Sequence, residues 1–450
     1  MAQATHPVDE ILPLGKLVPF GLQHVLVMAA SPITSVFLVT RALHVPDAIA
    51  VGLVSATFLI CGLGTLLQSF GPSAGPWRIG ARLPFVMIPG GAPVAIFIAI
   101  ARETNLQTAV GAVIITAIMY IPILAVFSRC LRYFPRLVIG TILLLVAINL
   151  IRIYGGIITG RPGTPGFGDP ANILLALATV GFTVLFARLL HGTFRQLSVL
   201  LGLVAGTLLA AALGRMSLAG VDAGPIVSLP AIFPFGLPRF DLVASIPLVI
   251  FSAISMSEAT GQTVAIAEVV GREIDLPRDV PATIRGDAIA SFFGALLGTS
   301  LIITSGENIG IVRATGIKSR YVTAVAGIML VVLALAAPVG RLVNAIPGPV
   351  IGGTALVVFC VIAVMGIDML RSVDVGAHDN LFTLAVGLMF GLLPILVPGM
   401  YARFPRAVEI VLGNGLAAGT IATVLLNILF HHVRRRAPVA AVSPGAAAGE

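Results

Sequence analysis

Two stretches far apart in the chain repeat one pattern, Phe134-Pro135-Arg136-Leu137-Val138-Ile139-Gly140 and Ile346-Pro347-Gly348-Pro349-Val350-Ile351-Gly352. Both read Pro-x-x-Val-Ile-Gly and open an apolar run. A second pair follows in each half, Gly202-Leu203-Val204-Ala205-Gly206-Thr207 and Gly415-Leu416-Ala417-Ala418-Gly419-Thr420. The two offsets are 212 and 213 residues. Short Gly/Ala/Val words match by chance, but two matches in nearly one register indicate an internal repeat.

The composition places this repeat in a membrane. Hydrophobic residues make up 58% of the chain and charged residues 10%, and the mean hydropathy is +1.06. Soluble domains carry roughly 25% charged residues. A water-facing surface needs more polar side chains than this chain has, whereas a bilayer accepts helices of about 20 apolar residues. The composition therefore excludes a soluble globular fold.

Apolar runs bounded by Gly, Pro and charged residues predict the membrane spans. They are 17–39, 48–69, 84–100, 106–127, 137–153, 171–190, 196–214, 243–266, 283–298, 301–315, 321–338, 348–367, 380–397 and 408–431. The repeat joins the fifth run to the twelfth and the seventh to the fourteenth, so each copy has seven spans. Because seven is odd, the second copy crosses the membrane in the opposite direction. We therefore expect an all-α polytopic membrane protein with 14 transmembrane segments in two inverted repeats.

The domain boundaries follow from these runs. They are a cytoplasmic N-terminus at 1–16, a first repeat at 17–216, a connecting loop at 217–242, a second repeat at 243–432 and a disordered cytoplasmic tail at 433–450. With the N-terminus inside, 18 of the 27 basic residues fall on the cytoplasmic side. This excess predicts a multi-pass protein of the inner (plasma) membrane with both termini in the cytoplasm. The first 16 residues lack a cleavage pattern and do not form a convincing signal peptide.

Two spans at equivalent places in the halves are irregular. The third opens with Pro84, Pro89, Gly90, Gly91 and Pro93, and the tenth is short and polar. Discontinuous helices carry the substrate site in many inverted-repeat transporters. We therefore expect the binding site where the third and tenth spans meet.

Three ionisable residues inside the spans are candidates for chemistry. A carboxylate in the membrane costs about 2.5–3.5 kcal/mol on insertion scales, so Glu258 and Glu307 need a reason to be there. Small residues surround both and leave room for a ligand. The alternatives are a packing carboxylate bonded to Ser or Thr at Glu258, and a helix N-terminal residue at Glu307. His24, early in the first span, is equally well explained as a hydrogen-bonded packing residue.

Other classes of function lack their residue patterns. No P-loop string occurs, and no nucleophile–base pair or cluster of metal ligands is present. Cys61, Cys130 and Cys360 have no paired spacing, so we expect no disulfide, metal or cofactor. The basic residues lack interleaved aromatic residues, which argues against nucleic acid. The glycine pairs of the second repeated word are expected to serve helix packing.

One string carries a family resemblance. Glu307-Asn308-Ile309-Gly310-Ile311-Val312-Arg313-Ala314-Thr315-Gly316 resembles the signature of the nucleobase–ascorbate transporter family, also called nucleobase:cation symporter type 2, which includes the xanthine and uracil permeases. Gly310 and Thr315 stand at fixed motif positions. Leu22-Gln23-His24, Glu258-Ala259-Thr260-Gly261 and Ile346-Pro347-Gly348-Pro349-Val350-Ile351-Gly352-Gly353 are also similar to that family, over roughly residues 15–432.

The resemblance implies an architecture and an activity. It implies a core and a gate domain, short extended segments in spans three and ten, and a homodimer in the lipid bilayer. It implies uptake of uracil, xanthine, urate or a related base, coupled to protons or, less often, sodium. Glu258, Glu307, Asn308 and Gly306 would bind the base, and Glu258, Glu307 or His24 would carry the coupling proton. A carboxylate suits such a base because it accepts from ring N–H groups.

Three departures from the family pattern bear on these expectations. Gln262 stands where many members have an acidic residue or histidine, so the coupling role shifts to Glu258 or Glu307. Arg82-Leu83 replaces a common Ser-Phe, so we expect either that Phe85, two residues on, stacks on the base or that the pocket is less aromatic. The substrate signals are mixed: Glu307-Asn308-Ile309-Gly310 is similar to uracil carriers, whereas more of the chain favours a purine. The alternatives are a pyrimidine permease of the same family and an anion transporter of the related fold.

Overall fold

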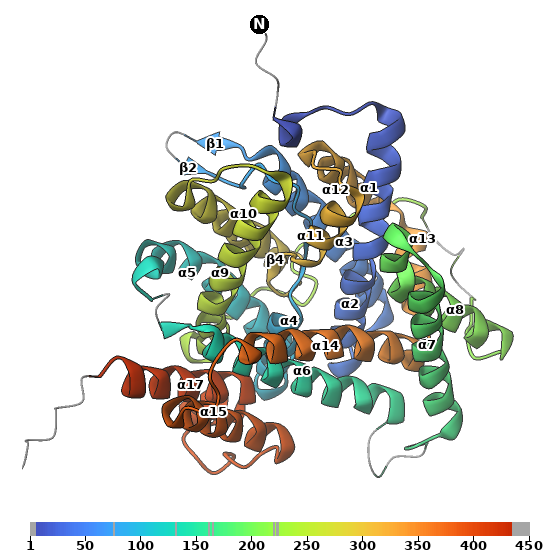
Figure 1. Ribbon diagram of the computed structural model, residues 1–450. Helices are drawn as coiled ribbons and strands as arrows, with labels where there is room; N and C mark the ends of the chain where they lie inside the picture. The colour runs from blue at the N-terminus through green and yellow to red at the C-terminus, as the bar shows by residue number, and fades with distance from the viewer. Residues whose placement is uncertain are drawn as a thin grey trace, which may run out of the picture.

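The computed structural model describes residues 6–433 except 75–76, 131–132, 161–162, 164–165, 219–220 and 222–224. The first five residues and nearly all of the expected disordered tail at 433–450 lie outside the described residues, as does the side chain of Cys130. The described residues are mostly helical and form two small two-stranded sheets (Figure 1).

Within the described residues, the first half of the chain holds three short strands and eight α-helices. Its elements are η1 (Pro7–Asp9), α1 (Leu14–Met28), α2 (Ala30–Ala42), α3 (Asp47–Phe70), β1 (Ser73–Ala74), β2 (Trp77–Arg78), β3 (Met87–Pro89), α4 (Gly91–Glu103), α5 (Leu106–Cys130), α6 (Arg136–Thr159), α7 (Pro170–Leu189), η3 (Gly192–Leu197) and α8 (Ser198–Ala212).

The second half resumes after a connection in which the described residues form no helix. Its elements are α9 (Leu242–Val270), α10 (Leu276–Leu296), β4 (Ile302–Thr304), α11 (Glu307–Thr315), α12 (Arg320–Leu335), α13 (Ala337–Ala345), α14 (Gly348–Arg371), α15 (His378–Leu396), α16 (Arg406–Gly413) and α17 (Gly415–His431). The apolar runs do not predict the short helices α13 and α16 as separate elements.

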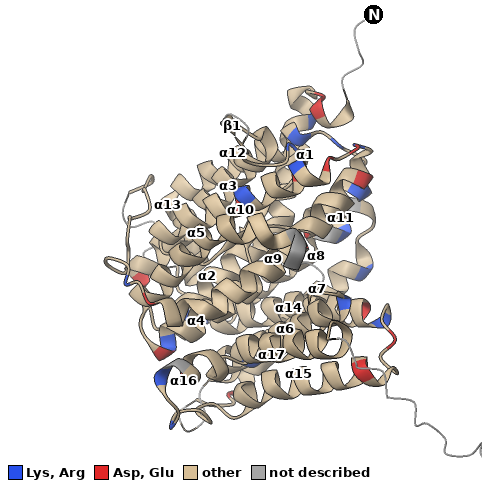
Figure 2. Ribbon diagram, turned by 90° about the vertical axis from the view of Figure 1, so that its left-hand side faces the viewer, with Lys and Arg blue, Asp and Glu red and all other residues tan. Residues whose placement is uncertain are grey.

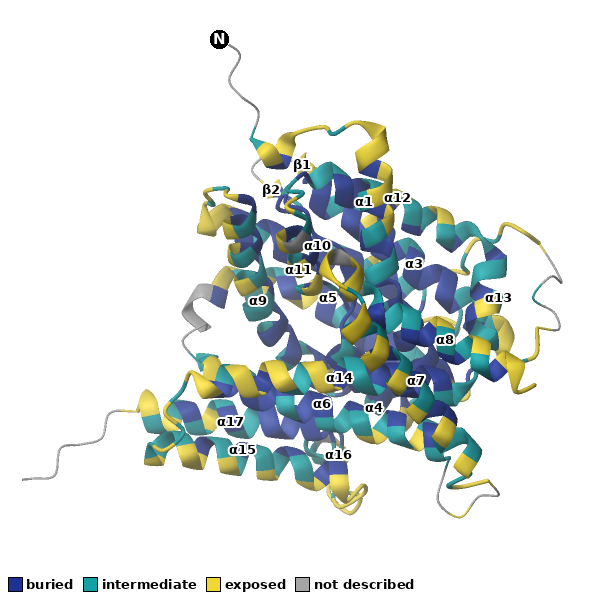
Figure 3. Ribbon diagram, turned by 45° about the vertical axis from the view of Figure 1, so that its right-hand side comes forward, coloured by how far each residue is buried: buried dark blue, intermediate teal, exposed yellow. Residues whose placement is uncertain are grey.

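The helices suit a bilayer. Among the described residues, eight helical stretches are long and apolar enough to cross a membrane, and α1 with α2 forms the first of them, Leu14–Ala42. Figure 2 shows charged residues mainly at helix ends and connections, with few in the interior. Figure 3 shows many exposed residues on the peripheral helices. On α7 the exposed residues include the large apolar Leu174, Leu177, Val184 and Leu185. Such a face is suited to lipid.

The helices pack in two groups. In the first group, α3 and α1 pack against α12, and α9 and α10 pack against α5. In the second group, α6 packs against α14, α7 against α8, and α15 against α17. Figure 1 shows the two groups in different parts of the molecule, with α14, α6, α15 and α17 running across the view below the first group.

The repeated Pro-x-x-Val-Ile-Gly word begins a helix in each half. Pro135 and Pro347 are the N-cap residues of α6 and α14, where a missing N–H costs nothing. A Cβ on Gly140 would lie 2.9 Å from the carbonyl oxygen of Gly366, and one on Gly352 would lie 2.6 Å from Ile158. The start of each helix thus meets the end of the other, so α6 and α14 run antiparallel in close contact.

The second repeated word also packs helices, as expected. Cβ atoms on Gly202 and Gly206 of α8 would lie 2.0 and 2.3 Å from hydroxyl oxygens of Thr183 and Thr179 on α7. In the other half, a Cβ on Gly415 of α17 would lie 2.4 Å from the carbonyl oxygen of Gly391 on α15. Only glycine permits these close helix–helix contacts, so the repeated segments 202–207 and 415–420 are both packing motifs.

Candidate functional site

The interior of the first group contains two helices that start in the middle of the molecule. β3 pairs antiparallel with β4, and the partners are Met87 with Thr304, Ile88 with Ile303 and Pro89 with Ile302. After β3 the chain begins α4, and after β4 it begins α11. Extended segments therefore stand at both places where the sequence is irregular. Two helix N-termini lie beside this pair of strands. At the start of α11, the N–H of Glu307 donates to Ser305 Oγ and the N–H of Ile309 to the carbonyl oxygen of Gly306.

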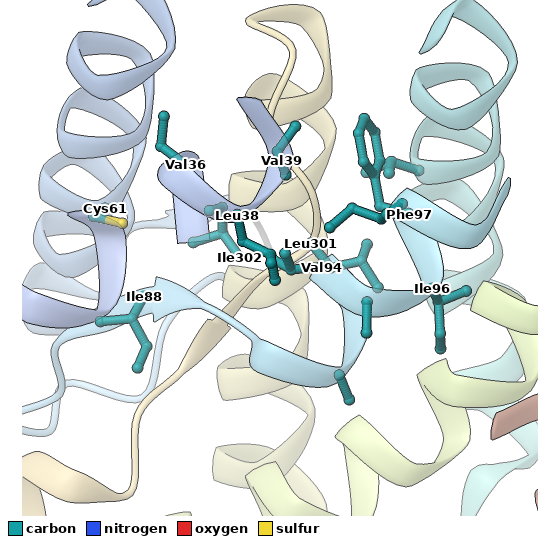
Figure 4. Packing of buried hydrophobic residues seen from close by; sticks show 14 of the residues in the cluster. Val36, Leu38, Val39, Cys61, Ile88, Val94, Ile96, Phe97, Leu301 and Ile302 are labelled. Carbon is teal, nitrogen blue, oxygen red and sulfur yellow. The ribbon is translucent and has the colours of Figure 1, made fainter. Parts of the chain in front are cut away.

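The strand pair is fixed by apolar packing. The side chains around it come from α2, α3 and α4 as well as from the strands. Figure 4 shows these side chains around the paired strands β3 and β4, namely Val36, Leu38, Val39, Cys61, Ile88, Val94, Ile96, Phe97, Leu301 and Ile302. Because this layer is buried on all sides, the starts of α4 and α11 are held rigidly with respect to each other.

One face of α9 and the start of α11 form the polar part of the candidate site. Gln262 of α9 packs against Gly306, since a Cβ on Gly306 would lie 3.2 Å from its Nε2 atom. Glu258 lies one turn before Gln262, and Glu307 directly follows Gly306. The site therefore brings together four of the residues that the sequence singles out.

This face has open space and unused acceptors. A Cβ on Gly261 would meet nothing within 4 Å, Glu307 is exposed and Glu258 is half-buried. Neither carboxylate accepts a hydrogen bond from a described residue. The buried Oε1 of Gln262 also lacks a partner there. A ligand with N–H donors would find three acceptors here.

Asn308 instead helps to hold the site together. Its side chain is 0% exposed, and Nδ2 donates to the carbonyl oxygen of Pro84, just before β3. Its Oδ1 has no partner among the described residues. The amide group therefore ties the start of α11 to the segment leading into β3, and its binding role stays a prediction.

Phe85 does not face open space in this conformation. Its ring is 0% exposed and lies in a small apolar cluster whose other buried members are Val8, Ala81, Leu83, Ile266, Ala267, Val270 and Val312. No face of the ring is free for a base. The expected stacking on Phe85 therefore requires a different arrangement of these residues, and it stays a prediction.

The remaining motif residues have local roles. Thr315 donates its hydroxyl to the carbonyl oxygen of Ile311 and accepts from the N–H of Ile317, which ends α11. Gly316 follows in a left-handed conformation at φ 68°, where glycine is favoured. Gly310 is exposed on α11. His24 is 3% exposed in α1, and its Nδ1 has no partner among the described residues.

The structure adds an acidic residue that the sequence patterns do not single out. Asp287 of α10 is 1% exposed and accepts hydrogen bonds from Thr304 Oγ1 at 2.6 Å, Thr304 N at 3.1 Å and Gln68 Nε2 at 3.2 Å. Asp287 is therefore a further buried carboxylate beside the residues singled out in the sequence. A signal for it exists in the sequence, because Asp287 falls inside the run 283–298 that is predicted as a span.

The Asp287 network joins three elements around β4. Gln68 of α3 also donates to the carbonyl oxygen of Thr283 at 2.9 Å and accepts from the N–H of Ala81 at 3.2 Å. Buried charge in a fully satisfied network fixes geometry. In the described part of the chain no group of three or more His, Cys, Asp or Glu side chains could hold a metal ion.

Comparisons with known proteins agree with this arrangement. A family profile described as Permease family, of the xanthine/uracil type, matches residues 15–400. The chain is 30% identical to the uric acid permease PucJ of Bacillus subtilis (strain 168), with 92% of each chain covered. It is also 30% identical to the xanthine permease of the same organism, with 93% of this chain and 94% of the relative covered.

A solved structure with a similar fold is the transmembrane domain of the cyanobacterial bicarbonate transporter BicA. The TM-score is 0.57 at 18% identity, and 94% of this chain and 98% of that chain are covered. At this identity the likeness concerns the fold alone. The match over residues 15–400, together with relatives that span nearly the whole length, shows that this chain belongs to the xanthine/uracil permease family.

Proposed function

We propose that this protein is a secondary active transporter that imports a purine nucleobase such as xanthine or urate together with a proton. The observation that carries this proposal is the pair of glutamates on the open face of α9 and α11. Neither carboxylate has a protein partner among the described residues, although both lie in a chain built for the membrane. The names of its relatives, uric acid permease and xanthine permease, support the choice of a purine.

The site chemistry matches a purine with carbonyl and ring N–H groups. Glu258 and Glu307 would each accept from ring N–H donors, and the positive end of the α11 dipole would favour a carbonyl oxygen. Gln262 offers an amide that can both donate and accept, and the absence of a side chain at Gly306 lets it pack against the start of α11. Asn308 supports the site through Pro84.

An inverted repeat of fourteen spans is supported by the packing. Each span in one repeat has an equivalent span in the other repeat, seven spans away. The equivalents of α3 and α12 are α10 and α5, and both pairs are in contact. The equivalents of α7 and α8 are α15 and α17, and these two pairs are also in contact. The matched helices α6 and α14 pack against each other and run antiparallel, as copies of opposite orientation would.

The two packing groups would then be the core and the gate. The core carries the glutamates and the strand pair, and the gate contains α6, α7, α8, α14, α15 and α17. Movement of one group against the other would expose the site alternately to the two sides of the membrane. Both termini would lie in the cytoplasm and the transporter would form a homodimer. Labelling of a cysteine placed at residue 440 from outside intact cells would contradict this orientation.

Proton coupling requires a group that binds a proton differently in the two states. Removal from water favours the neutral form of a carboxylate, so a glutamate that is covered in one state and open in the other can carry the proton. Gln262 cannot titrate. Glu258 is our first choice and Glu307 our second, and His24 lies in a covered position without a partner at Nδ1 among the described residues.

Two other functions compete with this one. A pyrimidine permease of the same family would use the same glutamates, so only a substrate panel separates it from a purine carrier. An anion transporter is suggested by the fold shared with BicA. The unpaired carboxylates argue against it, because they would repel an anion while ionised.

The experiment that tests the proposal is uptake into proteoliposomes of purified protein. A panel of labelled xanthine, urate, hypoxanthine and uracil is offered with and without an inward proton gradient. We expect concentrative uptake of xanthine or urate that collapses with a protonophore and does not depend on sodium. Uptake of bicarbonate but of no base would overturn the proposal, and sodium dependence that survives the protonophore would overturn its coupling part.

A further inference from the structure

A large cleft lies between the two helix groups, away from the glutamates. It has a volume of about 1200 Å³, and its walls come from α2 and α4 on one side and from α6, α14 and the α15–α16 connection on the other. Glu258 and Glu307 are not among its lining residues. Ligand pockets commonly measure about 300–1,000 Å³, so this cleft has room for a purine and water.

The chain direction assigns the cleft to one side of the membrane. It is bounded by the C-terminal ends of α2 and α4, the C-terminal half of α6 and the start of α14. α1 and α2 together form one spanning stretch, so the end of α2 lies on the opposite side from the N-terminus. With the termini in the cytoplasm, the cleft opens to the outside.

One charged residue in this cleft has no explanation in the packing. Arg152 lies seven residues before Thr159, the last residue of α6. Its Cα atom is therefore about 10 Å from the end of the helix, measured along the helix axis. It is exposed to the cleft and makes no hydrogen bond or ion pair with a described residue. Arginine inside a spanning helix is costly and typically faces a water-filled path for a substrate or ion.

The two other arginines of the cleft have partners within the protein. Arg41 lies over the ring of Phe37 at 5.1 Å, and Arg102 donates to the carbonyl oxygen of Ala42 at 3.4 Å. The negative groups are Glu103 at the end of α4 and Glu409 of α16. Three arginines against two glutamates leave the cleft cationic, and Arg152 is the arginine set deepest in a spanning helix.

Asn149 lies one turn before Arg152 on the same helix and also lines the cleft. Residues three apart on a helix share a face. A guanidinium presents several donors in one plane, and an amide adds one acceptor and two donors. The pair matches the edge of a planar anion that has a deprotonated ring nitrogen beside a carbonyl oxygen and an N–H.

We propose that Arg152 and Asn149 form an outer binding station for a planar monoanion, an oxidised purine that has lost a ring proton, ahead of the glutamate site. The inference rests on the proposed function. Such a station would explain how an anionic substrate reaches a site made of carboxylates, which repel an anion while they are ionised. The station draws the anion into the cleft, and a glutamate that already carries its proton no longer repels it.

The test is the concentration dependence of initial uptake from outside, measured for labelled urate as the anion and labelled hypoxanthine as the neutral base. In Arg152→Gln we expect the KM for external urate to rise about tenfold, the effect of losing a charged hydrogen-bonding partner, while the maximal rate stays near wild type. The KM for hypoxanthine and the KM for urate efflux should change less than about twofold. Arg152→Lys keeps the charge and should give an intermediate KM.

Arg371→Gln is the matched control, because Arg371 is also on a gate helix but lies exposed at the far end of α14. It should leave every KM unchanged. An unchanged urate KM in Arg152→Gln, or an equal rise for both bases, would overturn the inference. So would a wild-type protein that carries only neutral bases.

The lipid composition of the vesicles distinguishes a soluble anion at Arg152 from a lipid phosphate. The same measurements are made in pure phosphatidylcholine and with phosphatidylglycerol added. An effect of Arg152→Gln that is confined to the anionic lipid would assign Arg152 to the lipid and overturn the station. A wild-type protein that carries no base at all would refute the proposed function, whereas normal urate uptake with an insensitive Arg152→Gln variant refutes the station alone.

Discussion

The carboxylates of the packed helices α9, α10 and α11 lie in opposite surroundings. Asp287 of α10 is buried and accepts three hydrogen bonds from Thr304 and Gln68. Glu258 and Glu307 border open space and accept none from the described residues. Since a charge in the membrane is costly, each of them must be stabilised by something. For Asp287 that partner is the protein, and for the two glutamates we infer that it is the substrate or a proton.

The largest effect is expected at Glu258. In Glu258→Gln an amide replaces the acceptor-only carboxylate, so one ring N–H of the base loses its partner. The loss of a hydrogen bond to a charged group is worth about 1.5–3 kcal/mol, more than tenfold in affinity. Uptake of labelled base should therefore be abolished while the amount of protein in the membrane stays normal. Wild-type affinity for every base would remove Glu258 from the site.

The next effect separates Asp287 from the glutamates. Asp287→Asn places an NH₂ group or a weaker acceptor against the Thr304 N–H and the Gln68 amide. Each weakened bond to the charged group is worth about 1.5–3 kcal/mol, so the thermal unfolding temperature of the purified protein should fall clearly.

Asp368→Asn is the control for this substitution, because the Asp368 side chain is 80% exposed and its ion pair with Arg371 is long, at 3.9 Å. It should unfold like wild type. An Asp287→Asn protein with normal stability but no base binding would move Asp287 from the scaffold into the binding site.

A smaller, several-fold effect is expected from pH. If an open glutamate carries the coupling proton, lowering the external pH raises its protonated fraction and the driving gradient together. Initial uptake should then rise as external pH falls, and a protonophore should remove the accumulation. In Glu258→Asp, which keeps a titratable group, the pH response should remain even where the rate is low. A flat profile across the acidic to neutral range in wild type would mean that neither glutamate is coupled.

The smallest effect is expected at a carboxylate on the surface. Asp9 pairs with Arg320 at 2.6 Å, and its side chain is 45% exposed. Exposed ion pairs contribute about 0.2–1 kcal/mol, so Asp9→Asn should change the unfolding temperature little and the uptake not at all. A loss of transport in this variant would indicate that the N-terminal segment, which also places Val8 in the cluster around Phe85, takes part in the transport cycle.

The sequence predicts the helices well where composition alone decides them. The run 48–69 corresponds to α3 at Asp47–Phe70, and the run 348–367 to the longer α14. The third span is visible as irregular because several Pro and Gly residues cluster at its start, and the tenth because it is short and polar. A single proline does not have this effect, since Pro122 and Pro247 lie inside the continuous helices α5 and α9. The short helices α13 and α16 are not predicted because their apolar residues cover one side of a helix too short to cross the membrane.

Side-chain surroundings are harder to predict than the helices. No pattern in the sequence indicates that Phe85 points into a covered cluster, since that depends on how η1, α9 and α11 meet. Nor does any pattern reveal that Thr304 and Gln68, far apart in the chain, converge on Asp287. Glu258 and Glu307 could be proposed because their local sequence is polar and rich in small residues inside apolar runs.

An open glutamate that binds the base and a buried aspartate that holds the fold should respond differently to ligand. The most direct test is the shift in unfolding temperature that xanthine or urate causes in detergent-purified wild type, Glu258→Gln and Asp287→Asn. A ligand that binds only the folded protein raises this temperature. We predict a rise for wild type, no rise for Glu258→Gln from a normal starting temperature, and a rise for Asp287→Asn from a lower one. A full ligand-induced rise in Glu258→Gln would contradict this division of roles.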